Sequence, residues 1–275
     1  MARERFGVGL ARAGGGSLIF SLPILMTMEM WELGFYMDRL RLALLLVLAV
    51  PLLVGLSHVS GFEETFDVKE DVVDAFVAYA VGFVVAATVL LLFGVLGAAM
   101  PLDQVVGKVA LQAVPGGIGA LLAQSQLGGD APGGEDGDDP RAGRPSTYAS
   151  QLFLMAVGAL FLAFNIAPTE EMVIISYLMP IGAVLALVAV SLVTMHAFVY
   201  ALEFSGQEQP RPGTPAWSVF LRYTVVGYAV ALAVSAYALW TFGRLDDTGA
   251  VEAVTAVLVL GFPAAVGAAA ARLIL

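Results

Sequence analysis

Apolar runs of about 18 residues or more recur along the whole chain, and they constrain its fold more than any other feature. A soluble domain needs a polar surface, whereas 59% of these 275 residues are hydrophobic and only 13% are charged. The mean hydropathy is correspondingly high, at +0.88. Each run can cross a hydrocarbon core about 30 Å thick as a helix. We therefore expect an all-α, polytopic transmembrane bundle whose surroundings are the lipid bilayer.

The apolar runs predict about eight membrane spans. The fourth is the exception, because it contains Asp103, Lys108 and the sequence VPGG at 114–117. A re-entrant or interfacial segment there, which would leave seven spans, stays open. The expected spans are 17–37, 41–60, 73–99, 103–125, 149–167, 172–202, 217–242 and 249–274.

Lysine and arginine residues predict the orientation, since they collect on the cytoplasmic side. With a cytoplasmic N-terminus, nine of the 13 fall inside or at the inner boundary, and Arg39, Arg41, Lys108 and Arg244 fall outside. The basic segment before the first span has no small-residue cleavage signal, which favours a retained anchor. We expect a multi-pass protein of the cell membrane with both termini in the cytoplasm.

The two halves of the chain resemble each other, which predicts a parallel duplication of a four-helix unit. We divide the chain into a first repeat at 1–126, an acidic Gly/Pro-rich cytoplasmic linker at 127–148 and a second repeat at 149–275. Chance similarity between apolar segments is the alternative. The matching pairs are Phe76 with Phe220 and Tyr79 with Tyr223 at an offset of 144, Pro115 with Pro263 and Gly119 with Gly267 at 148, and the only two histidines, His58 and His196, at 138.

Glu29 lies near the middle of the apolar run LIFSLPILMTMEMWELGFYM at 18–37, and Glu32 follows one turn later. A carboxylate at mid-membrane costs about 2.5–3.5 kcal/mol on insertion scales, so it normally faces the bundle interior and serves a function. Two acids on one helical face could share a proton or bind a hard cation.

The second half carries an acidic motif at AFNIAPTEEM, residues 163–172. The residue before a proline avoids the helical conformation, so the chain should unwind near Ala167 and free backbone carbonyls. Asn165, Glu170 and Glu171 would add side-chain oxygens for an ion, and the histidine offset pairs Glu32 with Glu170. The same acids are equally well explained as the first turn of a helix that begins after Thr169.

The histidines, His58 and His196, lie toward the cytoplasmic ends of their spans. They are interfacial residues or proton acceptors at the inner mouth, and the sequence leaves both interpretations open.

Several function classes are excluded by what the chain lacks. There is no cysteine, and the net charge of −10 argues against nucleic acid as a partner. Nucleotide-binding loops, nucleophile motifs and zinc motifs are absent, so we expect neither an enzyme nor a cofactor. A homo-oligomer stays open.

The segments GGGSLIFSLPILMTMEMWELGF and NIAPTEE resemble a bacterial and haloarchaeal family of integral membrane proteins of unknown function. The resemblance extends over essentially the whole chain. It implies the membrane fold and draws attention to the two acidic motifs, but it implies no activity.

The sequence thus leads to two functional hypotheses. The first is a transporter or channel for protons or for monovalent or divalent cations, with Glu29, Glu32, Asn165, Glu170 and Glu171 as the ion-binding residues. The second is a non-transporting membrane sensor or assembly module in which Glu29 is buried for structural reasons.

Overall fold

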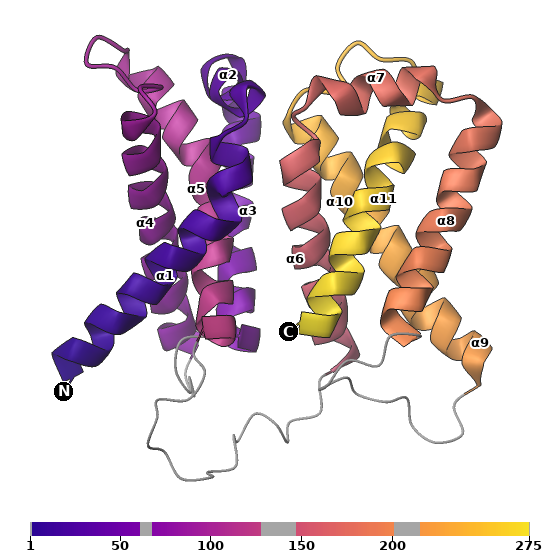
Figure 1. Ribbon diagram of the computed structural model, residues 1–275, viewed down its shortest axis with the longest axis horizontal. Coiled ribbons are helices and arrows are strands. Elements are labelled where there is room, and N and C mark those ends of the chain that lie inside the picture. Colours follow the sequence, from indigo (N-terminus) through magenta and orange to yellow (C-terminus); the bar gives the residue numbers. More distant parts are fainter. Residues whose placement is uncertain (1, 61–67, 128–146, 201–214, 275) are drawn as a thin grey trace. The chain divides into compact units, whose positions relative to one another are not determined.

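The computed structural model describes residues 2–60, 68–127, 147–200 and 215–274, and all regular elements in these segments are helices (Figure 1). Eight of these helices are long and apolar enough to cross a membrane. The expected all-α bundle is therefore confirmed. The chain divides into two compact units, unit 1 over Met1–Tyr148 and unit 2 over Ala149–Leu275.

Unit 1 has four long helices, one of which is surrounded by the others. In the spanning segment of this central helix, α5, 89% of the residues are buried. In the spanning segments of α1, α3 and α4, the buried share is 33% each. The helix α5 runs unbroken through VPGG, so the re-entrant alternative for 103–125 is wrong. The elements are α1 (Ala2–Leu25), α2 (Met28–Tyr36), α3 (Arg39–Ser60), α4 (Val68–Leu92) and α5 (Leu102–Leu127).

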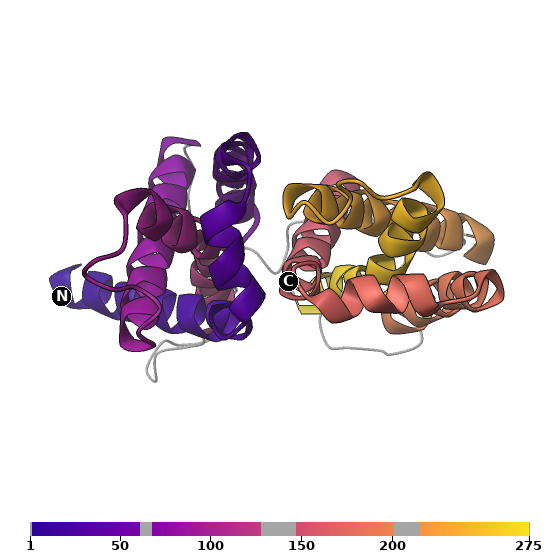
Figure 2. The ribbon, with the colours of Figure 1, turned by 90° about the horizontal axis from the view of Figure 1, so that it is seen from above.

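Unit 2 has the same order of elements: a long helix, a nine-residue helix and three further spans. Its third span contains a six-residue π-helical segment, η1, where the helix is locally wider. Seen from above, the long helices of each unit are grouped around that unit's own axis (Figure 2). The elements are α6 (Tyr148–Ile166), α7 (Glu170–Leu178), α8 (Ile181–Tyr200), α9 (Ala216–Val219), η1 (Phe220–Val225), α10 (Val226–Thr241) and α11 (Ala250–Ile274).

The first apolar run is not one helix. It breaks at Met26 and Thr27, so the first span is Gly7–Leu25 and Glu29 lies in the first turn of the separate helix α2. The expected span at 17–37 and the mid-membrane position of Glu29 are therefore wrong. The physical reason is that Thr27 takes the extended conformation of a helix N-cap. The Thr27 hydroxyl donates to the carbonyl of Pro23 at 2.6 Å and does not cap α2, so the start depends on the backbone conformation and on Glu29 near the positive end of the helix dipole.

Unit 2 breaks at the corresponding place. The helix α6 ends at Ile166 and α7 begins at Glu170, so the unwinding expected near Ala167 is confirmed. The expected span at 172–202 is wrong, because α7 ends before Pro180 and only α8 is long enough to cross the membrane. Figure 1 shows α7 lying across the ends of the long helices of its unit.

The third span of each unit ends in the same way. Gly94 and Gly243 both have φ 72°, in the left-handed region that a glycine adopts without strain. After each glycine, the next backbone N–H donates to the carbonyl five residues earlier, Val95 to Leu90 and Arg244 to Leu239. These are the bonds of a Schellman motif. The third span of unit 1 therefore ends at Leu92, before the expected 99.

The first and last spans of each unit approach closely through glycine pairs. In unit 1 a Cβ added at Gly16 would overlap the backbone of Gly119 and the side chain of Ala123. In unit 2 a Cβ added at Gly158 would overlap the backbone of Gly267. Small residues let membrane helices pack at this distance.

Candidate functional site

Glu29 and Glu32 lie on α2, at the end of unit 1 where α1 finishes. Glu29 is half-buried and Glu32 is exposed. A carboxylate in the first turn is stabilised by the positive end of the helix dipole. This ordinary role explains Glu29 without a bound ion, and its ion-binding role stays a prediction.

The helix α2 is fixed by bonds that the sequence did not predict. The indole Nε1 of Trp31 donates to the carbonyl of Leu25 at 2.7 Å, which satisfies a backbone oxygen freed by the break. The ammonium of Lys108, on α5, donates to the carbonyl of Trp31 and lies within electrostatic reach of Glu32. A Cβ at Gly34 would overlap the backbone of Lys108, so α2 is held directly against α5.

At the break of unit 2, a protein side chain takes the place that we expected for a cation. The guanidinium of Arg244 donates to the carbonyl of the buried residue Pro168. The amide nitrogen of Asn165 donates to the carbonyl of Phe161 at 2.7 Å, and its buried oxygen has no hydrogen-bond partner. Because Arg244 already supplies a positive charge there, a metal cation would meet electrostatic repulsion.

Glu170 and Glu171 are exposed in the first turn of α7. The N-caps Thr27 and Thr169 align Glu171 with Glu29, at an offset of 142. The histidine offset of 138 would instead pair Glu32 with Glu170, and that pairing stays a prediction. Among the residues that the structure describes, no group of three or more His, Asp or Glu side chains could hold a metal ion.

Each histidine joins the second span of its unit to the third. The Nδ1 of His58 lies 2.9 Å from Oδ2 of Asp71, and the Nδ1 of His196 lies 2.9 Å from Oγ1 of Thr224. The His196 ring also packs edge-on against Phe220, with centroids 5.2 Å apart. His58 is thus paired with an acid, whereas His196 is paired with a hydroxyl group.

The interior of unit 1 contains polar side chains that the sequence reasoning missed. Gln112, midway along the spanning part of α5, is fully buried, and neither its amide nitrogen nor its amide oxygen has a hydrogen-bond partner. Ser17 and Tyr79 are also buried with unpaired oxygens. Ser17 lies beside Gly116, and the Cα of Tyr79 lies 3.5 Å from a Cβ added at Gly117.

One sequence signal could have found these residues. Lys108, Gln112 and Gly116 recur every four residues, so they share one face of α5. That face is buried, because Lys108 is only 9% exposed and Gln112 is not exposed at all. The apolar character of the whole run concealed the polar face.

The helices and the comparisons together define the class of the chain: it is a multi-pass integral membrane protein. It belongs to the integral membrane protein family DUF2391, whose sequence profile matches residues 9–275. No curated protein and no solved structure matches the chain. The membrane assignment and the resemblance noted from the two acidic motifs are thereby confirmed.

Proposed function

We propose that this protein transports protons or small cations, and that the path runs through unit 1 along the buried polar face of α5. The observation that carries the proposal is Gln112, an amide that is fully buried at mid-span without hydrogen-bond partners. A buried polar group left unpaired costs about 1–3 kcal/mol. Polar residues inside a membrane span are for this reason usually functional.

Unit 2 supports the proposal, because it builds the same helix without the polar face. At the offset of 148 that relates Pro115 to Pro263, Gln112 corresponds to Leu260 and Lys108 to Ala256. Leu260 is fully buried and Ala256 is 5% exposed. The fold therefore does not require an amide at this position, which favours a functional reason for Gln112 over a structural one.

The buried polar groups of unit 1 span most of the membrane thickness. Lys108 lies about 6 Å from the level of Gln112 along α5, and Gly116, beside Ser17, lies about 6 Å further on. Tyr79 is at the same depth as this turn, and Asp71 lies about 12 Å beyond it along α4. Water molecules that enter when the helices separate would connect these groups into a path for protons or ions.

The acids at the helix breaks have a secondary role in the proposed path. Glu29 and Glu32 on α2 would raise the local concentration of cations at the surface of unit 1, and Glu170 and Glu171 on α7 would do so at the surface of unit 2. Their carboxylates belong to the entrance region and not to the middle of the membrane.

We further propose that the units are copies of one ancestral four-span unit. Support comes from features that recur at consistent offsets and in the same chain order. The glycine contacts, N-caps and helix ends pair Gly16 with Gly158 and Thr27 with Thr169 at 142, Gly94 with Gly243 at 149, and Pro115 with Pro263 and Gly119 with Gly267 at 148. At the offset of 149 given by these helix ends, Tyr79 corresponds to Tyr228, whereas the sequence match at 144 paired it with Tyr223.

We also propose that the protein lies in the cell membrane with both termini in the cytoplasm. The support is that the sequence places most Lys and Arg residues on the same side of the spans as the termini. The breaks, α2 and α7 would then lie at the outer surface, and His58, Asp71 and the linker at the inner surface. We use the words outer and inner in this sense below.

The test is ion flux in liposomes that contain the purified protein. The wild type should move protons, Na⁺, K⁺ or Ca²⁺ down an imposed gradient. Gln112→Leu should reduce that flux by about tenfold, which corresponds to about 1.4 kcal/mol of added barrier. The matched control is Leu260→Met in unit 2, which should leave the flux unchanged. No flux of any of the four ions, or equal flux in Gln112→Leu, would overturn the proposal.

A non-transporting assembly module is the second candidate, and the dense packing of α5 favours it. In that case Gln112 would serve helix packing or bind a partner subunit. The module is indicated if the wild type moves no ion and Gln112→Leu changes only the stability of the detergent-solubilised protein.

A further inference from the structure

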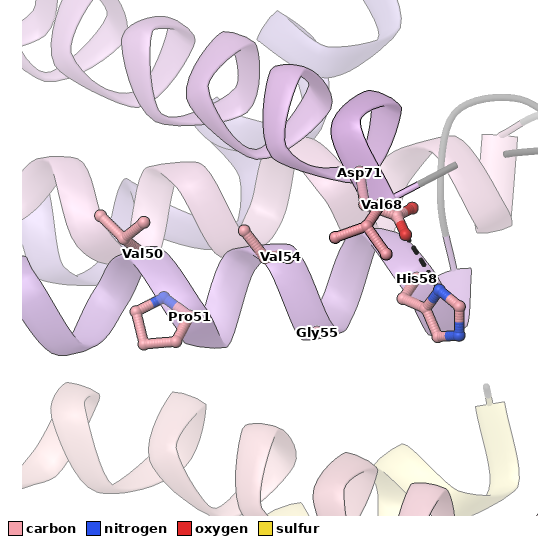
Figure 3. Close-up of a pocket in the computed structure, with 7 residues that line it drawn as sticks. All are labelled: Val50, Pro51, Val54, Gly55, His58, Val68 and Asp71. Atoms are coloured by element: carbon pink, nitrogen blue, oxygen red, sulfur yellow. Dashed lines mark hydrogen bonds and ion pairs between the residues drawn. The ribbon is translucent and has the colours of Figure 1, made fainter. Parts of the chain in front are cut away.

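The inner end of unit 1 combines a buried carboxylate with an exposed imidazole. The side chain of Asp71, in the first turn of α4, is only 3% exposed, whereas that of His58, in the last turn of α3, is 69% exposed. The 2.9 Å contact between them connects the protein interior with the aqueous boundary (Figure 3).

An open groove of about 600 Å³ leads along α3 to this pair (Figure 3). Its walls are apolar except at the end, where His58 and Asp71 lie. Among the described side chains at this end of the unit, the other titratable ones are Lys69, Glu70 and Asp74 on α4 and Arg12 on α1. A small molecule can therefore reach the imidazole at this end of the groove, where the His58 side chain is 69% exposed.

In the described part of unit 2, the histidine contact is with Thr224 instead of an acid. At the offset of 142, His196 corresponds to Val54, and at the offset of 149, Thr224 corresponds to Ala75. Val54 and Ala75 each lie four residues from His58 and Asp71, respectively, so the contact in unit 2 is one helical turn further from the inner end. The partner of His196 is a hydroxyl group, which is a much weaker proton acceptor than a carboxylate. Among the contacts described for the two histidines, His58 therefore has the carboxylate contact, and His196 is the comparison residue.

We propose that His58 and Asp71 form the inner proton-exchange site of unit 1, with His58 as the proton shuttle and Asp71 as the internal acceptor. This inference rests on the proposed function and specifies its substrate as the proton, because an imidazole bonded to a carboxylate can take up a proton on one nitrogen and pass one on from the other.

The transfer is balanced and requires no other reactant. The neutral imidazole of His58 begins with its proton on Nδ1, donated to Oδ2 of Asp71. Nε2 takes a proton from hydronium, and the Nδ1 proton passes to Oδ2, which leaves water, a neutral carboxylic acid and the Nε2–H imidazole. Asp71 then gives its proton to water on the path, and exchange with bulk water restores the Nδ1–H form of His58.

The experiment is proton flux in the liposomes described above, with chemical rescue. His58→Ala should reduce proton flux by about tenfold or more, since a positioned acid–base group contributes at least that much. Added imidazole should restore much of the flux, because it can enter the groove beside the vacated position. A purely structural role for His58 would give no such rescue. His196→Ala is the matched control, and its flux should neither fall comparably nor respond to imidazole.

Asp71→Asn provides the second variant. It should reduce proton flux as His58→Ala does, but imidazole should not restore it, since the internal acceptor is missing. If the wild type conducts protons and Gln112→Leu does not, while His58→Ala conducts normally or is not rescued, this inference fails and the proposed function survives. If the wild type conducts nothing, the proposed function fails and the inference fails with it.

Discussion

Each of the two helix breaks leaves a backbone carbonyl without a helical partner, and a different side chain bonds it in each unit. In unit 1 the freed carbonyl of Leu25 is bonded by Trp31, six residues away on the next helix. In unit 2 the freed carbonyl of Pro168 is bonded by Arg244, 76 residues away at the end of α10. The first bond forms within one local segment, whereas the second requires the tertiary fold. The backbone break is thus the shared feature, and the donor that satisfies it is free to differ.

The last spans of the two units, α5 and α11, also differ at their centres. Unit 1 has the unpaired amide of Gln112, and unit 2 has Leu260 at the corresponding position. Unit 2 therefore has a buried apolar side chain where unit 1 has an unpaired amide. Under the proposed function, the ion path would therefore run through unit 1 and not through the corresponding place in unit 2.

Moving the amide into unit 2 should have the largest effect. Leu260→Gln removes buried apolar surface and leaves an unpaired amide in its place, so it should lower the free energy of unfolding by about 3 kcal/mol. Denaturant titration of the detergent-solubilised protein measures this loss. Leu260→Met is the control and should cost less than about 1.5 kcal/mol. A Leu260→Gln variant as stable as the wild type would mean that unit 2 tolerates polarity as unit 1 does.

Removing the long-range donor should have the next largest effect. Arg244→Met leaves the buried carbonyl of Pro168 unpaired and should cost about 2 kcal/mol, within the range for hydrogen bonds to charged groups. The same titration applies, and Arg244→Lys, which keeps one charged donor, should lose less. Equal losses for the two variants would show that the contribution of Arg244 is packing instead of hydrogen bonding.

Removing the local donor should have the smallest effect. Trp31→Phe keeps an aromatic ring but deletes the N–H that bonds Leu25, and it should cost about 1 kcal/mol. Trp217→Phe, at a side chain that is 68% exposed, is the control and should change stability little. A loss greater than that of Arg244→Met would reverse the ranking of the two breaks.

Much of the fold was predictable, because membrane spans require only long apolar runs. It was harder to predict where a helix begins and ends within an apolar run. Hydropathy treats Thr27 and Glu29 as interruptions of one span, although together they form a helix start. The same pattern at Thr169 and Glu170 was recognised because Pro168 precedes it. A proline marks a break by its covalent structure, whereas an N-cap depends on a choice of backbone conformation.

The candidate site was less predictable than the fold. Asn165 and the acids attracted attention because they are polar in an apolar sequence, but Gln112 is equally polar and was overlooked. Its importance depends on burial from several sides, and burial depends on which helix becomes central. The partners of His58 and of the Pro168 carbonyl, Asp71 and Arg244, come from other helices, and spacing within one segment cannot reveal such contacts.

The even number of spans in each unit has a consequence for how the protein could be produced. A chain that crosses the membrane four times returns to the side from which it started, so under the proposed topology the segment between the units would share one compartment with both chain ends. Two polypeptides encoded by separate genes, divided within residues 128–146, would each insert with the orientation that it has in the intact chain. Under the proposed topology, co-expression of the two halves would let each one be labelled, mutated or replaced alone.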